Sequence, residues 1–325
     1  APRGPRSDAA RCRISARPGL LVPIRQPALL KGVAAVLLFG TVPACIRTIH
    51  FDSVALGIAR LGLAALGMTL VLALAGNRPF GRGRDWSLAT LTPLAAIGGV
   101  FGVHWLLFFL SIKLASASIG AIGFSTYGVQ LALIGWAAGH PRPGWRTAVG
   151  VALAMVGSWC CLPAGETAAV GDRFGLGLLL GILCGTAYAV LPLLHQRYAE
   201  IDHNVRTWGQ FTFGLCVFLA CAPAARQWGR NLTDVWMLIH LGIVVTLVGH
   251  LLWVHATTEL PIRITSVLAY LQLPAALAVN HFAIGEPMTV WMLAGAGCIV
   301  AANALALSGQ THQLTPAEVE ELAGD

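Results

Sequence analysis

Long and almost uninterrupted apolar stretches restrict the fold of this 325-residue chain more than any other feature. Each stretch is close to the roughly 20 residues that an α-helix needs to cross a bilayer. About ten of them follow one another, near residues 31–48, 53–76, 89–111, 116–138, 145–163, 174–196, 206–224, 234–256, 265–284 and 288–308. Backbone polar groups in lipid must be satisfied internally, and these runs are too long for barrel strands. We therefore predict an all-α polytopic membrane protein with about ten transmembrane helices.

The charge content also indicates a chain that is dissolved mainly in lipid. Only 11% of the residues are charged, against about 25% in a typical soluble domain. A basic tail before residue 31 carries much of the net charge of +7, whereas residues 309–325 contain four acids and neither Lys nor Arg. This distribution predicts a lipid-bilayer partner and no nucleic-acid partner. The Arg-rich tail is typical of the cytoplasmic flank of a first span, and a transit peptide is the alternative interpretation.

The content of Lys and Arg in alternate loops predicts the orientation. If the N-terminus is cytoplasmic, the inside segments hold fifteen Lys and Arg residues and the outside segments hold five. Much of this difference comes from the N-terminal tail. We therefore expect both termini to be cytoplasmic and the protein to reside in a bacterial inner membrane.

Two turn sequences resemble each other, GHPRPGW at 139–145 and GEPMTVW at 285–291. The same offset of 146 residues relates His104 to His250. Each copy contains five spans, and because five is odd, the second copy must enter the membrane upside down. Inverted repeats of this kind are the plan of many secondary transporters, whose halves rock about a central site. A chance match within a biased composition is the alternative. The predicted units are a basic tail at 1–30, a repeat at 31–163, an inverted repeat at 174–308 and an acidic tail at 309–325.

A family resemblance becomes visible in LAYLQLPAALAVNHFAIGEPMTVWMLAGAGCIVAANALAL, residues 268–307. This segment resembles the second half of EamA-type proteins of the drug/metabolite transporter superfamily, with Pro274 and Glu286 at the positions of the family pattern. Arg60, in ALGIARLGLAAL, resembles the family's early arginine. The first half departs from the pattern, because Gly128 stands where Pro274 falls in the second half and His140 where Glu286 falls.

The resemblance covers roughly residues 31–308. It implies a secondary transporter that moves a small organic metabolite, such as an amino acid or a drug-like solute, by alternating access. It also implies export as the direction of transport. Glu286 falls in a turn just before the last helix, where an acid favourably caps a helix N-terminus.

Polar side chains inside spans are costly and usually face the interior of the bundle. His104 and His250 occupy matched positions in the two repeats. We interpret them as a polar pair near the pseudo-twofold axis that binds solute or carries protons. A packing hydrogen bond in each half is the alternative.

The remaining candidates are mostly aromatic. Phe124, Tyr127 and Gln130 recur at a spacing of three residues, which places them near one helical face. Aromatic rings with an occasional amide suit an amphipathic organic solute, although ordinary packing would give the same pattern. The predicted solute-binding residues are His104, His250, Trp105, Trp253, Phe124, Tyr127, Gln130, Tyr270, Gln272 and Arg60, and the predicted gating residues are Pro43 and Pro274. Each proline weakens its helix locally, and Arg60 could equally anchor a structural network.

Motifs of other protein classes do not occur in the sequence. Neither a Walker A pattern nor an H-E-x-x-H motif is present, and the cysteines form no C-x-x-C pair. We therefore expect no catalytic residue, no metal and no cofactor. Two rival interpretations stay open, namely a membrane enzyme for amphipathic or lipid-linked substrates that uses His104 and His250 as acid and base, and a partner subunit that does not transport. A homodimer is also left open.

Overall fold

The computed structural model describes residues 26–76, 87–115, 117–140, 143–161, 173–285 and 288–308. Every regular element in these ranges is helical, which confirms the all-α prediction. Seven helical segments are long and apolar enough to cross a membrane, and Val290–Leu305 forms a shorter apolar helix. The predicted acidic tail, nearly all of the basic tail and the predicted cap Glu286 lie outside the described residues.

The first five spans follow the predicted order. Two of them are broken near their middle, at Gly40 and at Thr126. The elements are α1 (Gln26–Phe39) with α2 (Val42–Thr48), α3 (Ser53–Leu74), α4 (Leu88–Leu114), α5 (Ala117–Ser125) with α6 (Tyr127–Ala137), and α7 (Trp145–Cys160).

The second five spans are also interrupted in two places. A ten-residue π-helix replaces part of one span, and a short 3₁₀ turn precedes Pro274 in the next. The elements are α9 (Arg173–Arg197), α10 (His203–Ala220), η1 (Ala222–Ala224), α11 (Leu232–Ile239) with η2 (His240–Gly249) and α12 (His250–Glu259), α13 (Ile262–Leu268) with η3 (Ala269–Leu271) and α14 (Gln272–Ile284), and α15 (Val290–Ser308).

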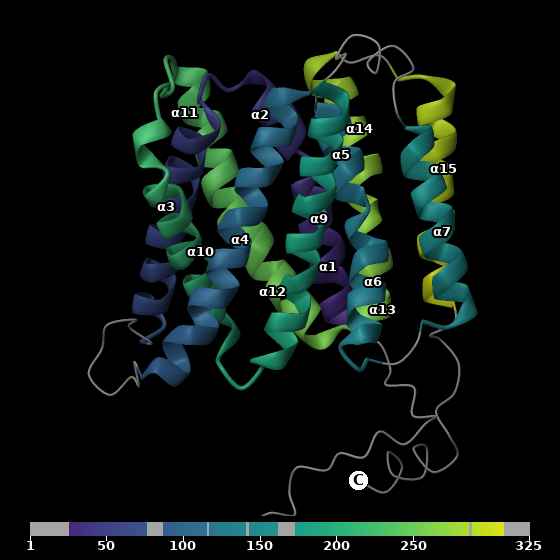
Figure 1. The fold of residues 1–325 in the computed structure, drawn as a ribbon, viewed down its shortest axis with the longest axis horizontal. Helices are drawn as coiled ribbons and strands as arrows, with labels where there is room; N and C mark the ends of the chain where they lie inside the picture. The colour runs from purple at the N-terminus through teal and green to yellow at the C-terminus, as the bar shows by residue number, and fades with distance from the viewer. Residues whose placement is uncertain are drawn as a thin grey trace, which may run out of the picture.

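The two similar turns lie at opposite faces of the bundle. Helix α6 ends and α7 begins at the lower edge of Figure 1, whereas α14 ends and α15 begins at the upper edge. The second five-helix unit is therefore inverted relative to the first, as the sequence predicts. Gly139 and Gly285 have φ values of +92° and +71°. This left-handed conformation favours glycine after a helix end, which explains why glycine recurs in both turns.

Glycines also let α4 of the first unit cross α10 of the second at close range. A Cβ atom at Gly98 would lie 2.7 Å from the carbonyl oxygen of Gly209 and 2.9 Å from the amide nitrogen of Gly214. The adjacent Gly99 has nothing within 4 Å of the equivalent point. Small residues allow such close backbone approach in membrane bundles, and here the approach holds the helix of His104 against the second repeat.

At the upper end, one carboxylate ties the two units together. Asp52 Oδ1 caps α3 by accepting from the amides of Val54 (2.9 Å) and Ala55 (2.8 Å). Its Oδ2 accepts from the amides of Arg226 and Gln227, each at 2.6 Å. Partial burial on its own raises the pKa of Asp52, but these four N–H donors outweigh it and hold that pKa below its usual value.

We expect Asp52→Ala to lower the unfolding free energy by about 2 kcal/mol at pH 7, because it removes a helix cap and a tie between two loops. The carboxylate contributes stability above its ordinary pKa, and this contribution is lost as pH falls through the lower native pKa. The gap in melting temperature between wild type and variant should therefore be full at neutral pH and shrink only below about pH 4. Glu200→Gln, an exposed acid change, serves as the control.

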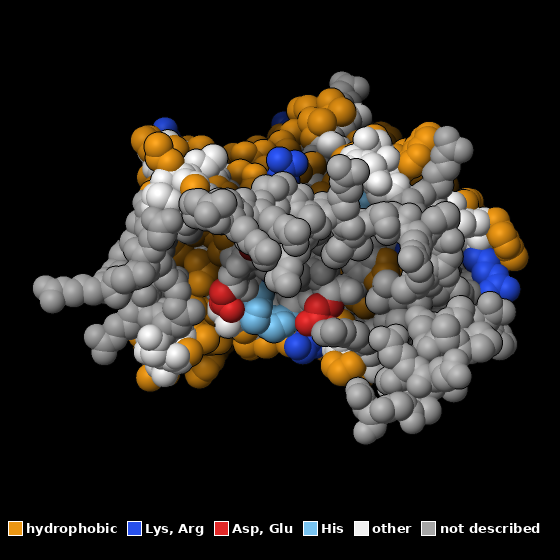
Figure 2. Space-filling view, turned by 90° about the horizontal axis from the view of Figure 1, so that it is seen from below, with side chains coloured by type: hydrophobic (Ala, Val, Ile, Leu, Met, Phe, Trp, Pro, Cys, Tyr) orange, Lys and Arg blue, Asp and Glu red, His pale blue; other side chains and the backbone are white. Residues whose placement is uncertain are grey.

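The lower end is closed by a second polar group of residues. Figure 2 views this face and shows histidine side chains between acidic ones. The rings of His203 on α10 and His255 on α12 have centroids 3.5 Å apart. Lys31 Nζ of α1 lies 3.4 Å from His255 Nδ1, and Asp202 Oδ2 lies 3.8 Å from His203 Nδ1. Three helices from both repeats therefore meet here.

Candidate functional site

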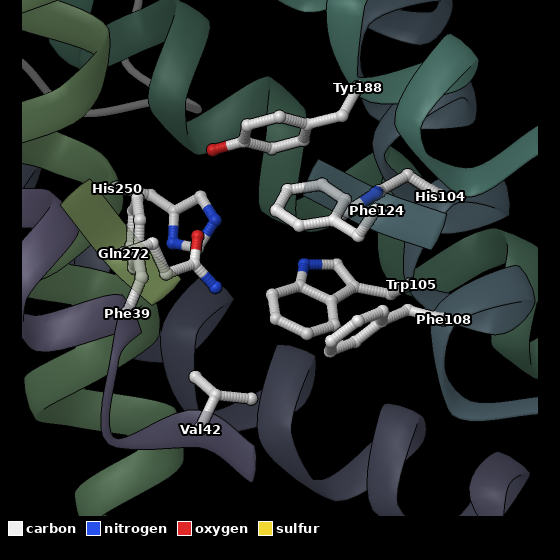
Figure 3. A pocket seen from close by; sticks show the side chains of 9 residues that line it. All are labelled: Phe39, Val42, His104, Trp105, Phe108, Phe124, Tyr188, His250 and Gln272. Atoms are coloured by element: carbon white, nitrogen blue, oxygen red, sulfur yellow. The ribbon is translucent and has the colours of Figure 1, made fainter. Parts of the chain in front are cut away.

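The two matched histidines line one small cavity between the repeats (Figure 3). His104 comes from α4 and His250 from the start of α12. The cavity is lined by Phe39, Val42, His104, Trp105, Phe108, Phe124, Tyr188, His250 and Gln272. The free space in the cavity is about 20 Å³, which holds little more than one water molecule. An organic solute needs more room than this, so it can bind only after the lining side chains or helices move apart.

Each histidine is surrounded by aromatic rings and bonded in the same way. The ring centroid of His104 lies 4.5 Å from that of Tyr188, and the centroid of His250 lies 4.5 Å from that of Phe39. His104 Nδ1 is 3.3 Å from the carbonyl oxygen of Cys184, and His250 Nδ1 is 3.3 Å from that of Val245. When Nδ1–H donates to a carbonyl, Nε2 is left as an acceptor. Both rings can therefore accept a hydrogen bond from a solute through Nε2.

Arg60 places a positive charge beside this cavity. Its side chain is only 1% exposed, and its Cζ atom lies 3.7 Å from the ring centroid of Trp105, a cavity residue. Nε donates to Thr246 Oγ1 of the π-helix at 2.5 Å. Neither Nη1 nor Nη2 has a hydrogen-bond partner among the described residues. A buried guanidinium with two unused donor groups is costly, and it is suited to bind a planar anion such as a carboxylate.

Other buried polar atoms near the centre also lack partners in the described part of the chain. They are Trp105 Nε1, Tyr127 Oη, Gln130 Oε1, His250 Nε2 and Trp253 Nε1. Buried polar groups are normally hydrogen-bonded, and each exception asks for an explanation. A set of them around one chamber indicates a place that binds a polar ligand.

A second small cavity adjoins the first and shares Phe124 and Gln272 with it. Its lining residues are Pro43, Ala121, Phe124, Ser125, Tyr127, Ala269, Tyr270, Gln272, Leu273 and Ala276, and its volume is also about 20 Å³. Phe124 and Gln272 lie between the two spaces. Together they form a chamber, which we define as the residues of both cavities.

The structure brings most of the predicted site residues to this chamber. His104, His250, Trp105, Phe124 and Gln272 line the first cavity, and Tyr127, Tyr270 and Pro43 line the second. Arg60 and Trp253 stand behind it, packed on Trp105 and on Phe39 respectively. Gln130 lines neither cavity and donates to Thr126 Oγ1 at 2.8 Å. Pro274 lines neither cavity and lies just after the 3₁₀ turn.

Several chamber residues were not predicted from the sequence. They are Phe39, Val42, Phe108 and Tyr188 at the first cavity, together with Cys184 and Thr246, which bond His104 and Arg60. One signal in the sequence does point to two of them. Val42 and Tyr188 are 146 residues apart, as His104 and His250 are, so an inverted pair of repeats places both near the twofold axis.

Below the chamber, Arg206 of α10 is held in a buried polar network. Its Nε donates to the carbonyl of Ile201 at 2.9 Å, and its Nη1 donates to the carbonyl of His195 and to Thr258 Oγ1 at 3.3 Å. His195 Nε2 lies 2.7 Å from Gln210 Oε1. The network joins α9, α10 and α12.

A mainly aromatic chamber with two histidines, between two inverted five-helix units, defines a membrane protein with the architecture of a secondary transporter. The EamA-like transporter family matches residues 26–162 and 175–308, one match for each repeat. The chain therefore belongs to the EamA-like transporter family, which is a family of transporters and not of enzymes.

Individual relatives agree with this assignment. The chain is 31% identical over 217 residues to the threonine/homoserine exporter RhtA of Escherichia coli K12, covering 65% of this chain and 69% of RhtA. It is 25% identical over 236 residues to an uncharacterized transporter of Archaeoglobus fulgidus, covering 71% of this chain and 79% of that protein. A solved structure described only as the crystal structure of a protein superposes with a TM-score of 0.73 at 17% identity, covering 89% of this chain and 100% of that one. That likeness concerns the fold alone.

Proposed function

We propose that this protein exports a small solute that carries a carboxylate, of the α-amino acid class, by alternating access. The observation that carries the proposal is that neither Nη group of the buried Arg60 has a hydrogen-bond partner among the described residues. Arg60 forms no described ion pair with an acid. A bound carboxylate would supply both the missing charge and the missing acceptors.

The rest of the chamber suits the other end of an amino acid. An ammonium group is attracted to aromatic faces, and the rings of Phe124 and Tyr188 line the first cavity. The acceptor nitrogen His250 Nε2 can take a hydrogen bond from an ammonium or a side-chain hydroxyl. The RhtA relative, whose name states threonine and homoserine as its solutes, supports this class and the export direction. We also propose a bacterial inner membrane with both termini cytoplasmic, on the distribution of Lys and Arg.

Flux into proteoliposomes tests the function. Vesicles loaded with unlabelled L-threonine or L-homoserine should accumulate the labelled amino acid by exchange, and vesicles without protein should not. The methyl ester of threonine keeps the amine and hydroxyl but lacks the carboxylate, so it should be exchanged at least about tenfold more slowly, the effect of about 1.4 kcal/mol. Equal exchange of acid and ester would contradict the role given to Arg60.

The histidine pair gives a separate prediction. If His104 and His250 couple transport to protons, an inward or outward pH gradient should change the flux in wild type, and His104→Ala with His250→Ala should remove that change. We expect the double variant to retain exchange without a gradient, at a reduced rate, since each ring also binds solute. A flux that a gradient changes equally in wild type and variant would show that the proton path lies elsewhere.

A further inference from the structure

Arg206 stands in the second repeat where Arg60 stands in the first. The two residues are 146 positions apart, the offset that also relates His104 to His250. Both side chains are only 1% exposed, and they are the two largest fully buried side chains of the described chain. Arg60 lies in the first half of α3 and Arg206 close to the start of α10. Because the second unit is inverted, α3 starts at the upper end of the bundle and α10 at the lower end (Figure 1).

The two guanidinium groups differ in what binds them. Arg206 uses Nε and Nη1 on protein acceptors from α9, the α9–α10 turn and α12. Arg60 uses only Nε, on Thr246, and its two Nη groups have no partner in the described ranges. In this conformation the lower arginine is held by protein acceptors, whereas the Nη groups of the buried upper arginine have no hydrogen-bond partner among the described residues.

Two inverted repeats exchange their conformations when such a transporter turns from one side to the other. We propose that Arg206 is the second carboxylate-binding site of the transport cycle. When the lower end opens, the bonds of Arg206 to His195 and Thr258 break, and its guanidinium receives the solute carboxylate that Arg60 releases. This proposal rests on the proposed function, because it requires a solute that carries a carboxylate.

Cys184, near the middle of α9, reports on access to the chamber. It is 0% exposed at the chamber, with Sγ 3.1 Å from His104 Nδ1. In a protein whose other cysteines are replaced by serine, N-ethylmaleimide should label Cys184 slowly. Arg206→Gln should speed this labelling by about tenfold or more, because it removes the bonds that keep the lower end closed. Arg197→Gln, the same change at an exposed arginine near the same end, should leave the rate at the wild-type value.

Measurements of L-threonine binding and exchange then distinguish an Arg206 that binds solute from an Arg206 that only keeps the lower end closed. In detergent, Arg206→Gln keeps Arg60 and should still bind threonine, but up to about tenfold more weakly, because the open lower end reduces the population in which Arg60 binds the carboxylate. In vesicles the same variant should lose exchange by about 50-fold or more. Arg206→Lys should recover part of that exchange. Equal labelling of Arg206→Gln and Arg197→Gln, or full exchange by Arg206→Gln, would overturn the proposal. If wild type itself does not bind or exchange threonine, the proposed function fails, and the labelling result still reports on whether Arg206 closes the lower end.

Discussion

Replacing Arg60 by Gln should abolish transport and at the same time make the protein more stable. Two charge-assisted hydrogen bonds to a carboxylate contribute about 1.5–3 kcal/mol each, so their loss should weaken solute binding by about 10²–10⁴-fold. The ligand-free protein, in contrast, holds a buried guanidinium that contacts the Trp105 ring and Thr246 but has no described partner for its two Nη groups. Replacing buried ionic groups by neutral ones is often neutral or stabilising by about 1–4 kcal/mol, so the melting temperature should rise.

A loss of transport together with a rise in melting temperature would indicate that Arg60 binds solute and does not stabilise the fold. Exchange of amino acid in vesicles measures the first effect, and thermal unfolding without solute measures the second. Arg226→Gln, at an exposed arginine of the upper end, is the matched control and should change neither. Arg60→Lys should keep some transport, because it keeps the charge but not the two parallel donors. A fall in melting temperature for Arg60→Gln would show that Arg60 holds the bundle together.

Gly98→Val should prevent stable folding, whereas Gly99→Val one residue later should be tolerated. A side chain at Gly98 meets the backbone of Gly209 and Gly214, which cannot move aside without separating α4 from α10. Such overpacking costs about 3 kcal/mol or more when backbone must shift. The same change at Gly99 meets open space and alters only the local helix propensity.

Gly98→Val and Gly99→Val can be compared directly because both add the same side chain to the same helix. Yield of monodisperse protein and the melting temperature in detergent are the measurements. Gly98→Val should lose both, and Gly99→Val should stay close to wild type. Comparable losses in the two variants would mean that α4 and α10 do not cross at Gly98.

The spans and their inversion could be predicted because lipid enforces a simple rule. Every backbone polar group in the bilayer must be satisfied within its own segment, so each spanning helix must be long, apolar and nearly continuous. The repeated turns then reveal the duplication, because Gly139 and Gly285 occupy a left-handed conformation that favours glycine. An odd number of spans in each copy leaves inversion as the only arrangement.

The breaks within spans were harder to predict. The π-helix at His240–Gly249 and the interruption at Thr126 occur inside apolar runs with no sequence signature of their own. Such irregular segments depend on bonds from neighbouring helices, as Thr246 is bonded by Arg60. A hydropathy pattern contains no information about those neighbours.

The sequence by itself determined the lipid-spanning class, the two inverted copies and the polar residue types that must face inward, because solvation by lipid acts on each segment independently. Only the tertiary structure decided that His104, His250 and Trp105 share one cavity, that Tyr188 and Val42 join them, and that Arg206 is bonded while the Nη groups of Arg60 are not. These facts depend on how helices distant in sequence rotate and cross. Helix packing of this kind is a property of the whole bundle. It brings the residues of the chamber together and places the charge of Arg60 beside them.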